Sequence, residues 1–220
     1  MKNIILLAPP AAGKGTQGKL ISETYHIPTI SIGEIMRNAR NPETEVGRII
    51  IECQDNRKLV PLDITLKLMK DRINEKDCEN GYILDGFPRS IEQAEEYDKM
   101  LKEMGKDEGI VIFMDIDKDL AFKRTMSRIV CPSCSATYNL LVPELKPKEE
   151  NICDNCHNVL KKRTDDNEET FYKGFNTYME NTFDLIKYYE DKKILRKVIV
   201  DEEKTPQELF EEIKEILEND

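Results

Sequence analysis

The sequence lacks an excess of positive charge. Its 220 residues contain 33 Lys and Arg against 43 Asp and Glu, which gives a net charge of −10. Proteins that bind duplex DNA or anionic membrane surfaces need clustered positive charge. We therefore expect no nucleic acid and no membrane among the partners. A phosphate site is still compatible with this balance, because it depends on a local arrangement of donors rather than on net charge.

Long apolar runs are also missing. No run approaches the ~20 residues that a membrane-spanning helix requires. The first residues, ending in Ile4–Ala8, resemble a secretory signal. Their apolar run is nevertheless shorter than the ~7–15 residues of such a signal, and Gly13-Lys14-Gly15 follows soon afterwards. We read Ile4–Leu7 as a buried strand and expect a cytoplasmic protein.

Short apolar segments alternate with helical patterns along a chain of ordinary globular composition, 39% hydrophobic and 35% charged. The length suffices for one or two domains with a full core. The predicted strands are Ile4–Leu7, Tyr82–Leu84, Ile110–Met114, Lys197–Val200 and, more weakly patterned, Pro28–Ile32. Ser90–Met104 has helical spacing, and Thr205 followed by Pro206 and Glu208 reads as the capped start of a last helix. Alternating strands and helices predict a doubly wound α/β sheet with helices on both faces.

Two segments interrupt this alternation. Residues 127–166 contain three prolines and four cysteines with little helical periodicity, as expected for a small inserted module. A second insert, at about residues 30–60, has helical patterns and follows the second predicted strand.

The segment after the first strand carries a phosphate-loop pattern, in which a glycine-rich turn leads into a helix through Gly-Lys. The residues that would surround the phosphates of ATP are Pro10, Ala11, Ala12, Gly13, Lys14, Gly15 and Thr16. Backbone N–H groups and the helix N-terminus favour phosphate there, and Lys14 would add a positive charge. Ala8 and Ala11 replace glycines of the pattern, and an alanine held at positive φ costs on the order of 1 kcal/mol. The alternative is an ordinary strand-turn-helix with an incidental Gly-Lys-Gly.

Four of the six cysteines form two Cys-x-x-Cys pairs, namely Cys131 with Cys134 and Cys153 with Cys156. Without a secretory signal, metal ligation is favoured over disulfides. Four thiolates make a closed tetrahedral site with no position for a catalytic water, so a structural Zn2+ is expected. Iron, unliganded thiols and ligation by the adjacent His157 are the alternatives. A zinc ribbon can also bind nucleic acid, but this module is not notably basic.

One motif is much more specific. Residues 81–89, Gly-Tyr-Ile-Leu-Asp-Gly-Phe-Pro-Arg, resemble the signature of adenylate kinases, in which apolar residues precede Asp-Gly-aromatic-Pro-Arg. The resemblance runs over essentially the whole chain. The phosphate loop, residues 30–37, residues 58–60, the Asp85 motif, Arg124 with Arg128, and residues 163–166 follow in family order.

This resemblance implies a fold and a reaction. The fold would be a P-loop kinase core of α/β type, with a parallel sheet flanked by helices. The core would comprise residues 1–30, 61–126 and 167–220, with a helical AMP-binding insert at 31–60 and a zinc-bearing lid at 127–166. The reaction would be reversible transfer of the γ-phosphoryl group from Mg-ATP to AMP, giving two ADP. The family default is a monomer.

The resemblance also implies roles for individual residues. The catalytic cations would be Lys14, Arg89, Arg124, Arg128 and Arg163. Besides the phosphate loop, ATP would contact Arg124, Arg128 and Tyr138. The AMP-binding residues would be Ile32, Arg37, Lys58, Val60, Gly86, Arg89, Gln93 and Arg163. Asp85 would orient Mg2+ through its waters, and Cys131, Cys134, Cys153 and Cys156 would hold Zn2+.

The chain departs from the family pattern at a few positions. Ile32 stands where the family usually has Thr in the adenine pocket, and Glu34 replaces an Asp. Gly174 replaces an arginine that bridges the phosphates of the two substrates, unless Lys173 or Lys162 substitutes. These departures, with Ala8 and Ala11, support two alternatives: a nucleoside monophosphate kinase with another acceptor or donor, and a nucleotide-binding relative with weak or lost catalysis.

Overall fold

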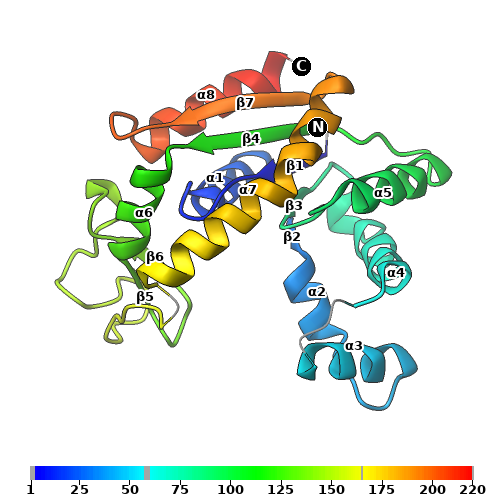
Figure 1. The fold of residues 1–220 in the computed structure, drawn as a ribbon, viewed down its shortest axis with the longest axis horizontal. Helices are drawn as coiled ribbons and strands as arrows, with labels where there is room; N and C mark the ends of the chain where they lie inside the picture. The colour runs from blue at the N-terminus through cyan, green and yellow to red at the C-terminus, as the bar shows by residue number, and fades with distance from the viewer. Residues whose placement is uncertain (1–2, 57–59, 165, 220) are drawn as a thin grey trace. The chain divides into compact units, whose positions relative to one another are not determined.

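The computed structural model describes residues 3–56, 60–164 and 166–219. Figure 1 labels the elements. The strands are β1 (Ile4–Leu7), β2 (Thr29–Ser31), β3 (Ile83–Asp85), β4 (Ile110–Ile116), β5 (Arg128–Val130), β6 (Thr137–Asn139) and β7 (Leu195–Val200). The α-helices are α1 (Lys14–Tyr25), α2 (Ile32–Asn38), α3 (Glu45–Asp55), α4 (Leu62–Ile73), α5 (Ile91–Glu103), α6 (Lys118–Met126), α7 (Glu168–Asp191) and α8 (Pro206–Asn219), and η1 (Lys76–Cys78) and η2 (Pro143–Leu145) are 3-10 turns.

The central sheet has the strand order β2-β3-β1-β4-β7. Its pairs β2–β3, β3–β1 and β1–β4 are parallel. All five predicted strands are present, with ends that differ by one or two residues, and helices connect them. The predicted α/β fold with a parallel sheet flanked by helices is therefore confirmed. Within the described residues, no helix is both long and apolar enough to cross a membrane.

The chain forms two compact units, which are described separately. The first comprises Met1–Leu7, Gly18–Phe113 and Asn181–Arg196, and the second comprises Ala8–Gln17, Met114–Glu180 and Lys197–Asp220. In the first unit, buried side chains from β1, β3 and β4 pack with α4, α5 and the last turns of α7. Near-continuous burial of β1 and β4 explains why their sequences are unbroken apolar runs rather than alternating ones.

Local capping sets the start of two helices, and the cap at Thr205 is the one that the sequence predicts. Ser90 caps α5, where its Oγ accepts the N–H of Gln93 at 3.2 Å. At α8, the Oγ1 of Thr205 accepts the N–H of Glu208, and the Glu208 carboxylate accepts the N–H of Thr205 at 2.8 Å. This reciprocal pair is a capping box.

The second unit contains an aromatic cluster and a small cysteine-bearing module. Phe122 of α6 stacks on Tyr172 and meets Phe171 edge-on, both from the first turn of α7. The module follows α6 in Figure 1 and consists of the antiparallel pair β5–β6 and the loops that extend to residue 164. Its own buried cluster includes Ile129, Tyr138 and Leu160. The predicted insert therefore has a core of its own, although a very small one.

The loop between β1 and α1 uses left-handed backbone at two positions. Gly13 has φ of +93°, and Ala11 has φ of +63°. Only the first of these two is a glycine, so Ala11 carries the steric cost of a Cβ in the left-handed region. Ala8 is buried at the end of β1 and has no positive φ, so its replacement of a glycine causes no such strain.

We expect Ala11→Gly to raise the free energy of unfolding by about 0.5–1 kcal/mol. Removing the Cβ relieves roughly 1–2 kcal/mol of left-handed strain, and the greater freedom of glycine in the unfolded chain offsets about 0.5–1 kcal/mol of this. Urea denaturation measures the change.

The matched control is Ala12→Gly. Ala12 is 1% exposed and has no positive φ, so losing its buried methyl group should lower the free energy of unfolding by about 1 kcal/mol. If Ala11→Gly destabilises the protein as much as Ala12→Gly does, the strain assignment is wrong.

Candidate functional site

The phosphate-loop residues lie in the second unit, at the start of α1. Lys14 is the first residue of α1, and Gly15 and Thr16 belong to its first turn. The N–H of Ala12 donates to the carbonyl of Pro9 at 3.3 Å, which closes the turn before the helix. Among the described residues, a Cβ built on Gly13 meets the Met114 side chain alone, at 3.9 Å, so the glycine is needed for its backbone conformation and not to avoid a clash. The helix N-terminus and the loop N–H groups form the arrangement that favours a phosphate.

Arg124 and Arg128 flank the end of α6 in the same unit. Arg124 donates from Nη2 to the carbonyl of Asp201 at 3.1 Å. Its Nε is buried and meets no acceptor among the described residues, and burial lowers its pKa. A buried, unpaired guanidinium N–H is costly, and an anionic ligand would satisfy it.

Arg128 is engaged in a different way. Its Nε donates to the Asp166 carboxylate at 2.9 Å, and its Nη2 donates to the other carboxylate oxygen. The Asp166 side chain is 3% exposed, so this two-point ion pair is well shielded from water. Arg163 is exposed and lies three residues before Asp166, whose N–H donates to the Arg163 carbonyl at 3.2 Å. Asp166 is a partner that the sequence pattern did not assign.

The predicted AMP-side residues, apart from Arg163, follow two adjacent strands of the first unit. Strands β2 and β3 are paired in a register that sets Ser31 opposite Asp85. Ile32 begins α2 directly after β2, and Arg37 lies in its last turn. Because parallel strands end at the same edge of a sheet, α2 and the loop after Asp85 leave that edge side by side.

The loop after β3 is shaped by hydrogen bonds. Gly86 has φ of +78° and its carbonyl accepts from Nε of Arg89 at 2.7 Å. The N–H of Arg89 donates to the side-chain carbonyl of Gln93 at 2.8 Å. Asp85, at the end of β3, is half-buried. This places one carboxylate and one guanidinium within five residues of each other at the carboxyl edge of the sheet.

For the remaining residues predicted to bind AMP, the structure gives the burial of those that it describes. Ile32 is half-buried and packs against the core of the first unit. Val60 is half-buried at the start of the segment leading to α4. Lys58 lies outside the described residues. Thus Ile32, Arg37, Val60, Gly86, Arg89 and Gln93 share the first unit, and the phosphate loop, Arg124, Arg128, Tyr138 and Arg163 share the second.

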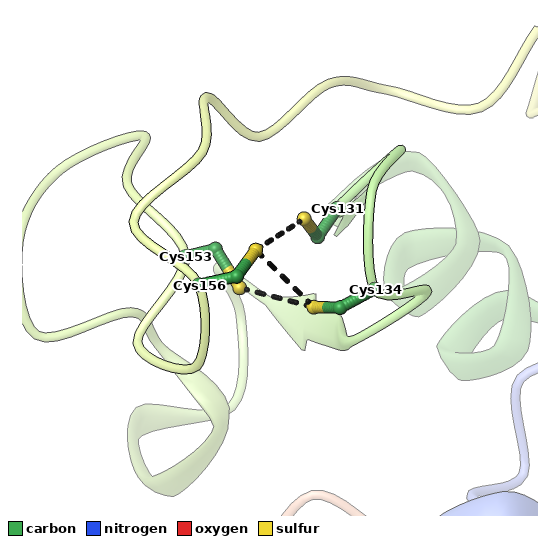
Figure 2. Close-up of side chains that lie close together, drawn as sticks. All are labelled: Cys131, Cys134, Cys153 and Cys156. Carbon is green, nitrogen blue, oxygen red and sulfur yellow. Dashed lines mark hydrogen bonds between the residues drawn. The ribbon is translucent and has the colours of Figure 1, made fainter.

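The four paired cysteines converge in the second unit. Figure 2 shows their sulfur atoms pointing toward one another from two loops. The Sγ atoms all lie within 4.8 Å of one another, and the closest pair, Cys131 and Cys156, is 3.3 Å apart. A tetrahedral Zn2+ with Zn–S bonds of about 2.3 Å has sulfurs about 3.8 Å apart. The donor set and its spacing therefore fit a four-thiolate metal site.

Tyr138 packs against this cysteine cluster. Its ring is 8% exposed and belongs to the buried cluster of the module. Its hydroxyl accepts the N–H of Asp154 at 2.7 Å and lies 3.5 Å from Sγ of Cys153. The hydrogen bond from this hydroxyl lowers the pKa of the Cys153 thiol to about 6. The side chain of Tyr138 therefore supports one member of the four-cysteine cluster, and its contact with ATP remains a prediction.

The other two cysteines are separate from this cluster. Cys53 is half-buried on α3. Cys78 is buried, and Nη1 of Arg72 lies 3.0 Å from its Sγ. Burial raises the pKa of the Cys78 thiol to about 11, so the thiol is protonated at neutral pH. The burial of Cys78 and its contact with Arg72 could not be inferred from the polar stretch of sequence around it.

Comparison with known proteins agrees with these features. The family model for adenylate kinase matches residues 6–194. A protein named adenylate kinase from Archaeoglobus fulgidus is 44% identical over 216 residues, and one from Clostridium tetani is 41% identical over 215 residues; each alignment covers 98% of both chains. A third, from Kosmotoga olearia, is 41% identical over 217 residues, 99% of each chain. The chain belongs to the adenylate kinase family.

Proposed function

We propose that this chain is an active enzyme of its family, which transfers the γ-phosphoryl group of Mg-ATP reversibly to AMP and gives two ADP. The observation that carries the proposal is the loop after β3. There Asp85 ends the strand, and Arg89 is held by Gly86 and Gln93. Phosphoryl transfer requires positioning and positive charge around the moving group, and this segment supplies both.

On the donor side, the phosphate loop would hold the phosphates of ATP. The N–H groups of residues 10–16 and the N-terminus of α1 would surround them, and Lys14 would add a point charge. Arg124 offers a buried N–H that lacks an acceptor among the described residues. Arg128 would contribute its guanidinium from a position fixed by Asp166. Arg163 is proposed to reach the transferring group on the strength of the family resemblance.

On the acceptor side, Arg37 and Arg89 would hold the phosphate of AMP. A guanidinium suits this task because its planar fork binds two phosphate oxygens at once. Ile32, Val60 and Gln93 would surround the adenine, and Lys58 and Gly86 would contact AMP through the backbone. An isoleucine at position 32 replaces a hydroxyl with an apolar surface, and the helix start remains half-buried.

Two metal ions complete the proposal. Asp85 would hold the waters of the Mg2+ that accompanies ATP, and this ion neutralises charge on the phosphates. The four-cysteine cluster would hold Zn2+, which would order the module of residues 127–166 rather than take part in transfer. We also expect a cytoplasmic monomer.

The decisive experiment measures ADP formation from Mg-ATP and AMP, with UMP and CMP run in parallel. Rapid ADP formation with AMP alone supports the proposal. Transfer to UMP or CMP instead would favour a kinase with another acceptor, for which Ile32 is the motivating residue. A folded, metal-loaded protein that binds nucleotides and transfers to none of the three would be a catalytically lost relative.

Lys14→Met should lower the rate of ADP formation by at least 10²–10³-fold, because a preorganised cation at the transferring phosphates contributes that much. The matched control is Lys19→Met on the exposed face of α1, where Lys19 pairs with Glu23 at 3.8 Å. Its rate should stay within about twofold of the parent rate. Equal rates for both variants, with unchanged circular dichroism, would refute the role of Lys14.

Gly174→Arg should raise the turnover number. A Cβ built on Gly174 meets no atom of the described residues within 4 Å, so the backbone has room for a side chain at this position. Lys118 of α6 lies over the ring of Tyr172 and donates to Asn176, so its ammonium group is already engaged. A restored transition-state cation can be worth on the order of 10²-fold.

Asn181→Arg controls for added charge, since it lies two turns further along α7 on the same helical face and is exposed. It should leave the turnover number unchanged. If Gly174→Arg also leaves turnover unchanged, another cation, such as Lys173 or Lys162, already serves the transition state.

Cys153→Ser should lower the melting temperature because it removes a metal ligand from a module with a very small core. A loss of about 2 kcal/mol would lower it by roughly 4–8 °C in a chain of this size. Cys53→Ser, outside the cluster, should change it far less. Metal content by mass spectrometry should fall only in Cys153→Ser. Equal melting curves and equal metal content for both variants would argue against a structural ion.

A further inference from the structure

The start of α5 carries an unusual side-chain hydrogen bond. In a capping box, the residue at the third helical position bonds back to the N–H of the cap residue itself. Here Ser90 is the cap and Gln93 is at the third position, yet Oε1 of Gln93 accepts the N–H of Arg89, one residue earlier, at 2.8 Å. Because a main-chain N–H can only donate, the atom that faces it is the amide oxygen.

Arg89 is fixed at a second point. Its Nε donates to the carbonyl of Gly86 at 2.7 Å. Gly86 has φ of +78°, and a Cβ there would lie 3.1 Å from Nη2 of Arg89. The absence of a side chain at position 86 therefore lets the guanidinium lie against the loop. Gln93 holds the main chain of Arg89 while Gly86 holds its Nε, so Nη1 and Nη2 form the edge that can meet a ligand.

Arg89 is an exposed residue. An exposed arginine samples many rotamers, and ordering such a side chain on binding costs enough to weaken affinity by about two- to tenfold. The contact of Nε with Gly86 reduces that cost before the ligand arrives, and the contact of Gln93 holds the main chain from which the side chain extends. They use the N–H and Nε, which leaves a pair of terminal nitrogens suited to two oxygens of a phosphate.

We propose that Gln93 is a positioning residue for the acceptor phosphate, in addition to the contact with the base that the resemblance implies for it. By accepting the N–H of Arg89, its side chain holds the loop in the conformation in which Arg89 meets the phosphate of a nucleoside monophosphate. This inference rests on the proposed function, which assigns Arg89 to that phosphate. One side chain would then couple recognition of the base to placement of the phosphate-binding cation.

A ligand without a base separates the two roles of Gln93. Calorimetry or NMR titration measures the dissociation constants of AMP and of ribose 5-phosphate, which keeps the phosphate and sugar and lacks the adenine. In Gln93→Leu, we expect the affinity for ribose 5-phosphate to fall by about three- to tenfold, and the affinity for AMP to fall at least as much. Exchange of the Arg89 amide proton should become faster, since its acceptor is lost.

Ser90→Ala is the matched control. It removes the Oγ that caps Gln93 at 3.2 Å, so it loosens the same helix start, but leaves the acceptor of the Arg89 N–H in place. Its affinity for ribose 5-phosphate should stay within about twofold of the parent value. Circular dichroism and thermal melts establish that both variants fold.

The outcomes also separate this inference from the proposed function. It is overturned if ribose 5-phosphate binds Gln93→Leu as well as the parent protein, if Ser90→Ala weakens binding equally, or if the parent protein does not bind ribose 5-phosphate. In each of these cases AMP-dependent ADP formation could still stand. Conversely, Gln93-dependent binding of ribose 5-phosphate by a protein that forms no ADP would sustain the inference and refute the proposed function.

Discussion

The register of the three adjacent strands β2, β3 and β1 is the constraint on which the acceptor side depends. It aligns Ser31, Asp85 and Leu6 in one row across the sheet. A shift by one residue would turn every side chain of a strand to the opposite face, and β1 and the first two residues of β3 are buried, so such a shift would be costly. With the register fixed, Asp85 and the first residue of α2 emerge from neighbouring strand ends. The proposed recognition of the acceptor would then need only short loops, and Gly86 and Gln93 shape the one after β3.

Much of this arrangement could be predicted from the sequence because it is encoded locally. Apolar runs marked the strands, and Thr205 marked a helix start whose cap the structure contains. The spacing of the two Cys-x-x-Cys pairs predicted a cluster, and the four sulfurs do converge. In each case the prediction rests on residues that are close in sequence, or on a fixed spacing between residues.

Contacts between distant segments could not be predicted in this way. Asp98 of α5 is 4% exposed and pairs with Tyr188 and Lys192, about ninety residues later in the chain, and Lys192 also pairs with Glu108. A charged residue in a helical pattern is ordinarily exposed, so nothing in the sequence marked this buried network. Breaking it by removing one partner would leave an uncompensated charge inside the first unit. The pairing of Arg128 with Asp166 and the packing of Tyr138 against Cys153 were missed for the same reason.

The departures from the family pattern differ in their physical consequences. Ala8 sits at a buried strand end without positive φ, and Ala11 adds roughly 1–2 kcal/mol of backbone strain. That strain belongs to the backbone of the folded protein, so its first consequence is lower stability. The replacement of an arginine by Gly174 is expected to affect the rate rather than the stability. A cation near the transferring phosphoryl group acts mainly when charge develops there in the transition state. The space around Gly174 is open, so no packing demand explains the glycine. The role that the resemblance implies for position 174 therefore predicts that the rate depends on how the charge of the missing arginine is replaced, whereas the alanines of the phosphate loop are expected to matter chiefly for stability.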